Sequence, residues 1–151
     1  MKLVVQRVQS ARVLVEGQVV GAIGRGALIL LGVARNDTPF DLRYLARKAS
    51  QLRIFDDENG QLNSSIESVH GAFLVVSQFT LYGECAKGNR PSYIEAAPPD
   101  EANRFYEEFV RELQALGHPV QTGRFGEKML VELQNDGPVT LILESRGRTI
   151  P

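Results

Sequence analysis

The chain has 151 residues, with 17 basic and 18 acidic side chains and a formal net charge of −1. A protein that binds nucleic acid along many phosphates usually carries a clear basic excess, so this balance excludes an extended phosphate-binding surface. Any nucleic-acid partner would be held at a small local site, such as a strand end. The length fits a single domain over residues 1–151, with a substantial buried core.

Cysteine usage and apolar patterns favour the cytoplasm. The only cysteine is Cys85, so no intrachain disulfide can form. The apolar run at the N-terminus is too short and too interrupted for a signal peptide. The longest apolar stretch, residues 27–34, falls well short of a membrane span. We therefore expect a cytoplasmic protein that has no membrane partner.

The first part of the chain is predicted to be β-structure. Residues 3–24 read as short strands with partial alternation, and a turn at residues 16–18 between two of them predicts a β-meander. Residues 26–34 are apolar without alternation, which is typical of a central strand covered on both faces. Residues 72–83 read as a second near-continuous apolar strand.

Two helices are predicted. The first lies within residues 36–52, where Thr38 can cap it, Pro39 suits its first turn and Asp41 completes a capping-box spacing. The second lies within residues 98–117, whose apolar positions recur at three-and-four spacing. Both helices should pack on a sheet.

The C-terminal part reads as two strands, residues 128–134 and 139–145. The Asp136-Gly137 pair between them is a strong hairpin-turn signal. Pro138 conflicts with an ordinary hairpin, because proline offers no N–H to the return strand. Two helices and about eight strands, without regular βαβ alternation, predict an α/β protein with three layers (β/β/α). We expect its layered sheets to be barrel-like, with both helices on one outer face.

Most familiar catalytic patterns do not occur. His70 and His118 lack a second ligand at metal-binding spacing, so we expect no metal. The glycines of residues 21–26 lead into a predicted strand, whereas a dinucleotide fingerprint leads into a helix, so we expect no cofactor. A nucleophile elbow of the G-x-S-x-G type is also missing.

One polar cluster stands out at the end of the strand predicted from residue 72. Ser77, Gln78 and Thr80 follow a run that is otherwise apolar. Polar groups at the end of a buried strand cost free energy unless they are hydrogen-bonded. The cluster is therefore either a satisfied hydrogen-bond network or a functional site, and the residues alone leave both interpretations open.

Five segments, in this order, resemble the D-aminoacyl-tRNA deacylase family. They are SQFTLYG at 77–83, GNRPSY at 88–93, AAPP at 96–99, TGRFG at 122–126 and NDGPVT at 135–140. The resemblance covers essentially the whole chain. It implies a carboxylic ester hydrolase that cleaves the ester between a D-amino acid and the 3′-terminal ribose of tRNA. Such chiral proofreading would exclude glycyl-tRNA poorly.

The same resemblance implies a homodimer with its active sites at the interface. A cis Gly137-Pro138 unit of one subunit enters the pocket of the other, and its carbonyls take the space that an L side chain would need. The tRNA 3′ end carrying a D-amino acid is the implied partner. Discrimination would then work by exclusion, which suits an enzyme that accepts many side chains of one handedness.

The resemblance also assigns roles around the polar cluster. Ser77, Gln78, Phe79 and Thr80 would line the pocket and carry catalysis, with backbone N–H groups near Phe79 binding the ester end. The ribose 2′-hydroxyl would help to activate water, which would explain why no histidine base is found. Thr80 as a covalent nucleophile is the alternative mechanism.

Three more residues belong to the implied site. Arg7 would help fix the Gly-Pro loop, Asn135 begins its motif, and Met129 would pack near the terminal adenine. A surface arginine and a core methionine are the alternatives for Arg7 and Met129. Two alternatives also stand for the whole chain: a non-catalytic module that binds the tRNA 3′ end, and a β-rich dimeric structural protein.

Overall fold

The computed structural model describes residues 1–145, and residues 146–151 of the expected domain lie outside the described part. The large mixed sheet contains β1 (Lys2–Val15), β2 (Gln18–Ile23), β3 (Gly26–Gly32), β6 (Ala72–Ser77), β7 (Val120–Thr122) and β8 (Leu130–Glu144). A small hairpin contains β4 (Phe55–Asp56) and β5 (Leu62–Ser64). The helices are α1 (Pro39–Gln51), α2 (Pro99–Ala115) and the short 3-10 helix η1 (Phe79–Tyr82).

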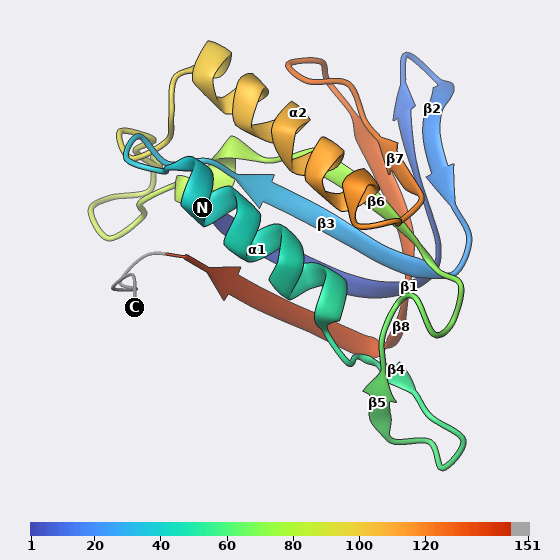
Figure 1. Cartoon of the computed structure of the whole chain (residues 1–151). Helices are drawn as coiled ribbons and strands as arrows, with labels where there is room; N and C mark the ends of the chain where they lie inside the picture. The colour runs from blue at the N-terminus through green and yellow to red at the C-terminus, as the bar shows by residue number, and fades with distance from the viewer. Residues whose placement is uncertain (146–151) are drawn as a thin grey trace.

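The large sheet curls into a nearly closed barrel, and both α-helices cover one outer face of it (Figure 1). β3 pairs with β1 on one side and, in parallel, with β6 on the other, so it is central as predicted. β2 closely approaches β7: a Cβ on Gly21 would lie 2.2 Å from the carbonyl oxygen of Thr122. The predicted α/β architecture, with a barrel-like sheet and two helices, is confirmed.

The turn predicted at residues 16–18 joins β1 to its antiparallel partner β2, but the meander predicted around it is wrong because β3 pairs with β1 and not with β2. Residues 2–15 form one long strand, which pairs with β2 through its second half and with β3 through its first half. The register of β1 shifts against β2 and twice against β8. Such bulges bend a strand and interrupt its alternation. The interrupted pattern therefore marks bends in one strand and not separate strands.

Two cores on opposite faces of the sheet explain why β3 and β6 are apolar along nearly their whole length. Ile29 and Val75 belong to the core shared with both helices. Leu28 and Leu74 belong to a second core on the other face, together with residues of β1 and β2. Successive side chains of a strand point to opposite faces, so a strand between two cores carries apolar residues at every position.

The helices begin where the sequence predicts. Thr38 precedes α1, its N–H donates to Asp41 Oδ2 (2.8 Å), and its hydroxyl donates to the same oxygen (2.7 Å). α2 begins at Pro99 and buries its apolar stripe against the sheet, including Phe105 and Phe109. Within residues 1–145, no helix is both long enough and apolar enough to span a membrane.

The C-terminal strand differs from the prediction in a way that matters for the site. Residues 130–144 form the single strand β8, which pairs antiparallel with β1 on both sides of residues 136–139. The Asp136-Gly137 pair therefore does not turn the chain back, and the two strands predicted at residues 128–134 and 139–145 are parts of one strand. The stretch from residue 135 to residue 140 is an excursion within one strand, and the chain resumes pairing with β1 after it.

Candidate active site

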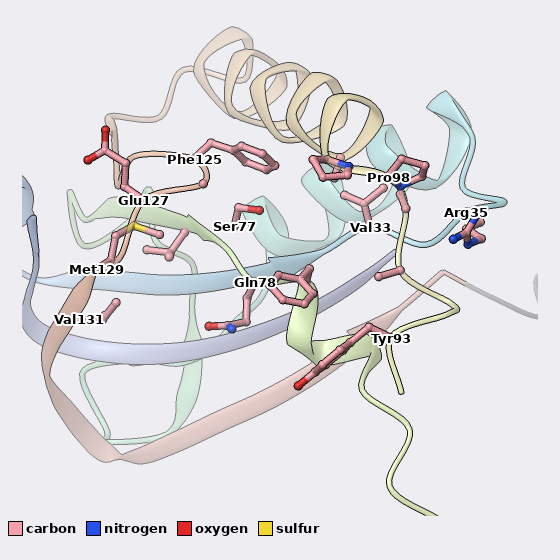
Figure 2. Close-up of a pocket in the computed structure, with 17 residues that line it drawn as sticks. Val33, Arg35, Ser77, Gln78, Tyr93, Pro98, Phe125, Glu127, Met129 and Val131 are labelled. Carbon is pink, nitrogen blue, oxygen red and sulfur yellow. The ribbon is translucent and has the colours of Figure 1, made fainter. Parts of the chain in front are cut away.

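A cavity of about 710 Å³ opens beyond the end of β6 (Figure 2). Its walls come from the β6–η1 segment, from residues 93–99 and the start of α2, and from residues 125–131. Most of the lining is apolar, and Ser77 and Gln78 place polar groups at the strand end. A largely apolar cavity with a few polar groups at one point is the usual form of a small-molecule site.

The corner between β6 and η1 shapes one wall of this cavity. The N–H of Gln78 donates to Leu31 O (2.7 Å), which ties the corner to β3. A Cβ on Gly32 would lie 3.1 Å from Leu81 Cβ, so glycine allows β3 to approach η1 closely. The apolar run to residue 83 predicts a longer strand, but β6 ends at Ser77 and η1 begins at Phe79.

This corner also starts a new helix at the cavity wall. The first N–H groups of a helix have no acceptor within that helix, and η1 begins at Phe79. The Phe79 side chain is half-exposed and packs edge-on against Tyr93, with 5.0 Å between the ring centroids. Both residues line the cavity. The corner thus places the start of η1 and an aromatic pair at the cavity wall.

The structure brings four of the predicted site residues together. Ser77, Gln78, Phe79 and Met129 all line the cavity. Thr80 is exposed and is not part of the lining, although its hydroxyl accepts a hydrogen bond from the Gln78 side-chain amide. Gln78 is therefore held by its neighbour at the cavity wall. Figure 2 shows Ser77 and Met129 on different sides of the same space.

The other predicted site residues gather at the β8 excursion, away from the cavity lining. Asn135 pairs with Val8 of β1 and Thr140 pairs with Gln6, so residues 136–139 stand opposite Arg7 alone. The N–H of Val139 donates to Asn135 Oδ1 (2.8 Å), and Asn135 Nδ2 donates to Thr140 Oγ1 (3.1 Å). These bonds close the base of the excursion.

Gly137 and Pro138 are exposed within the excursion, and the peptide bond between them is cis. Arg7 lies beside them and is almost fully buried, in contrast to the alternative of a surface arginine. Its Nε donates to Asp136 O (2.8 Å), and its Nη1 donates to Ile54 O (2.9 Å). Since a buried guanidinium needs partners, these contacts satisfy Arg7 and hold the excursion at once.

Two titratable groups near the helices have shifted pKa values and structural roles. Burial raises the pKa of the Tyr106 hydroxyl to about 12, and this hydroxyl donates to Val75 O (3.0 Å) on β6. Burial lowers the pKa of His118, whose ring forms a hydrogen bond with Ser50 Oγ and a T-shaped contact with the Phe73 ring. Neither group lines the cavity. The histidine is a packing residue at the end of α2.

Sequence reasoning left several cavity residues without a role. Phe125 and Glu127 lie on one side and Pro98 on another, and Arg35 lines the cavity from the segment after β3. The first three fall in or beside the segments TGRFG and AAPP, so those motifs were the available signal. Arg35 carried none. No group of three or more His, Cys, Asp or Glu side chains within residues 1–145 could hold a metal ion.

Known proteins of one family match this chain over nearly its full length. A family model described as D-Tyr-tRNA(Tyr) deacylase matches residues 4–144. A D-aminoacyl-tRNA deacylase of Desulfatibacillum aliphaticivorans is 58% identical, covering 97% of this chain and 100% of the relative. A D-aminoacyl-tRNA deacylase of Thermosipho africanus is 56% identical, covering 97% of this chain and 98% of the relative.

Solved structures share the fold. One described as c-Myc DNA Unwinding Element Binding Protein has a TM-score of 0.93 at 43% identity, covering 97% of this chain and 100% of that chain. Another, described as a probable eukaryotic D-amino acid tRNA deacylase, has a TM-score of 0.79 at 19% identity. It covers 95% of this chain and 98% of that chain, and at this identity it shows a common fold alone.

The fold, the cavity and these relatives define an enzyme, a hydrolase of the deacylase class. The chain belongs to the D-Tyr-tRNA(Tyr) deacylase family, whose model spans nearly all of the described residues.

Proposed function

We propose that the chain hydrolyses the ester that joins a D-amino acid to the 3′-terminal ribose of tRNA, releasing free tRNA and the amino acid. The observation that carries this proposal is the cavity at the end of β6, where Ser77, Gln78 and Phe79 meet in a chain of this family. Its volume of about 710 Å³ suits a single aminoacyl-adenosine end. The balanced net charge agrees with a substrate held mainly by that end.

Hydrolysis needs no side-chain nucleophile in this scheme. The N–H groups at the start of η1 stabilise the oxyanion that forms when water attacks the ester carbonyl. Such donors are worth about 3 to 4 kcal/mol each in an acyl-transfer site. The 2′-hydroxyl of the substrate ribose helps to activate the water. The position of Thr80 outside the cavity lining favours this route over a covalent Thr80 intermediate.

Chiral selection requires a second copy of the chain. The Gly137-Pro138 unit does not line the cavity of its own chain, although the excursion that carries it is well ordered by internal hydrogen bonds. In a homodimer this unit would enter the partner's cavity, and its carbonyls would exclude an L side chain. Within residues 1–145, β8 pairs only with β1, and it exposes Leu141 and Ile142. A second copy would cover these apolar side chains.

The rate of glycyl-tRNA cleavage tests whether chiral selection works by excluding L side chains. Glycine has no side chain to meet the Gly137-Pro138 carbonyls, so glycyl-tRNA should be cleaved more readily than L-aminoacyl-tRNA. A pocket that worked by positive contacts to the D side chain would reject glycine instead.

The deciding assay compares D-tyrosyl-tRNA with L-tyrosyl-tRNA and follows the loss of the ester. We expect rapid loss from the D substrate alone. Equal rates on both substrates would refute chiral selection. Binding of intact D-tyrosyl-tRNA without loss of the ester would identify a non-catalytic module for the tRNA 3′ end.

The dimer has its own test. Light scattering on the purified protein should give the mass of two chains of 16.7 kDa. A mass of one chain at the concentrations used in the assay would refute a site shared between subunits.

A further inference from the structure

The β4–β5 hairpin meets the β8 excursion through one side chain. Arg7 Nη1 donates to Ile54 O (2.9 Å) just before β4, and it also contacts Asp56 Oδ1 (3.3 Å) at the end of β4. On its other side, Arg7 Nε donates to Asp136 O (2.8 Å). Asp136 directly precedes Gly137. The guanidinium therefore bridges the base of the hairpin to the peptide that leads into the Gly-Pro unit.

The geometry makes this bridge rigid. The Arg7 side chain is only 7% exposed, and it stands at the one β1 position that faces the whole excursion. A guanidinium is planar and holds its donors at fixed angles, so anchoring Nη1 also fixes the direction of Nε. An ideal Cβ on Gly137 would lie 3.2 Å from Arg7 Nη2, which shows how closely the guanidinium approaches the Gly-Pro unit.

Two carboxylates form ion pairs with the Arg7 guanidinium. Asp56 Oδ1 lies 3.3 Å from Nη1, and Asp136 Oδ2 lies 3.5 Å from Nε. The two contacts attract the guanidinium in different directions, toward the hairpin and toward the excursion. Among residues 1–145, Asp56 is the carboxylate that ion-pairs with Arg7 on the hairpin side. Without its charge, Arg7 would be held less firmly at the hairpin, and the Asp136 carbonyl that accepts from Arg7 Nε would lose part of its fixed position.

We propose that Asp56 is a positioning residue for chiral selection, which acts through Arg7 on the placement of Gly137-Pro138. This inference rests on the proposed function, and it extends the selective machinery to the β4–β5 hairpin. Ile54 contributes a main-chain carbonyl, which a side-chain substitution does not remove. The Asp56 carboxylate is therefore the contact on the hairpin side that a substitution can change. Its side chain is half-exposed, which makes its contribution modest and open to variation without unfolding the chain.

The test compares three variants. Asp56→Asn keeps the shape of the side chain and removes its charge, while Asp56→Glu keeps the charge. Glu58→Gln makes the same charge change on the same hairpin, at an exposed residue with no ion pair among the described residues. Any effect of net charge alone would therefore appear in Asp56→Asn and Glu58→Gln alike.

The first measurement is hydrogen exchange of the peptide that spans residues 134–141, which does not depend on catalysis. We expect the Val139 amide, bonded to Asn135 in the excursion, to exchange several-fold faster in Asp56→Asn and at the wild-type rate in Glu58→Gln. Unchanged exchange in Asp56→Asn would overturn the proposal. If the wild-type protein removed no D-amino acid from tRNA, the proposed function would fail, and this exchange result would still decide whether Asp56 holds the excursion.

The second measurement is selectivity, the ratio of kcat/KM on D-tyrosyl-tRNA to kcat/KM on L-tyrosyl-tRNA. We expect Asp56→Asn to lower this ratio roughly three- to tenfold, which matches the loss of one partly exposed charged contact. Asp56→Glu should restore most of the ratio. A variant with a lower melting temperature but an unchanged ratio would show that Asp56 supports stability only, and would overturn its role in selection.

Discussion

Gly137→Ala is the sharpest single perturbation of the excursion. Gly137 has a φ of +135°, a conformation that residues with a Cβ rarely adopt. A Cβ there would lie 2.8 Å from Val139 Cγ2 and 2.9 Å from Val139 N. The second contact is with main chain that already donates to Asn135, so it cannot move away without weakening that bond.

The expected cost has two parts. A residue with a Cβ at such a φ costs about 1 to 3 kcal/mol, and loss of the Val139 to Asn135 hydrogen bond adds about 1 kcal/mol. A total near 3 kcal/mol would lower the melting temperature of a chain of this size by about 6 to 12 °C. In the proposed function the excursion carries the selective carbonyls, so the variant should also lose selectivity for D-tyrosyl-tRNA over L-tyrosyl-tRNA.

Gly17→Ala is the matched control. Gly17 has a φ of +76° in the turn between β1 and β2, and a Cβ there meets nothing within 4 Å. It should lose about 1 kcal/mol from backbone conformation alone and keep its selectivity. Thermal unfolding and the two-substrate deacylation assay measure both effects. If Gly137→Ala matched Gly17→Ala in both, the crowding at residue 137 would have no consequence and the reasoning would be refuted.

Three further variants test other parts of the structure. Thr80→Ala should keep D-tyrosyl-tRNA turnover within about tenfold, because its hydroxyl only supports Gln78, whereas the loss of a covalent nucleophile would abolish turnover. Asp37→Asn should lower the free energy of unfolding by about 3 to 5 kcal/mol in denaturant titrations, because Asp37 neutralises the buried ammonium of Met1. Tyr106 has a folded pKa raised to about 12, so its contribution to stability is present below pH 10 and lost as the pH rises from 10 to 12. The loss is at most about 1.4 kcal/mol per pH unit, and an equal alkaline decline in Tyr106→Phe would contradict this assignment.

The sequence predicted those parts of the fold that depend on local patterns. The cap at Thr38 and the apolar stripe of α2 follow from side chains a few residues apart, and both appear as expected. β3 was recognisable as central because its side chains face two cores. In each case one short segment contains all the information that the prediction needs.

The errors concern features that depend on partners far away in the sequence. The bulges of β1 exist only relative to β2 and β8, so the sequence of β1 alone looks like several strands. Similarly, η1 after the end of β6 packs closely against Gly32 of β3, a partner that the sequence of residues 72–83 does not contain. For the same reason the polar cluster at residues 77–80 was visible in the sequence, but the separation of Thr80 from the cavity was not.

The β8 excursion shows the same competition between local and distant contacts at the residues that matter most. Asp136-Gly137 favours a chain reversal, yet β8 continues along β1, because Arg7 and Asn135 provide the hydrogen bonds that a hairpin ladder would have supplied. Both of these residues belong to the same chain as the excursion. In the proposed dimer, the Gly-Pro unit must keep its shape before the second subunit arrives, since any ordering on association would reduce the affinity of the dimer. Internal support from Arg7 and Asn135 meets this requirement within one chain.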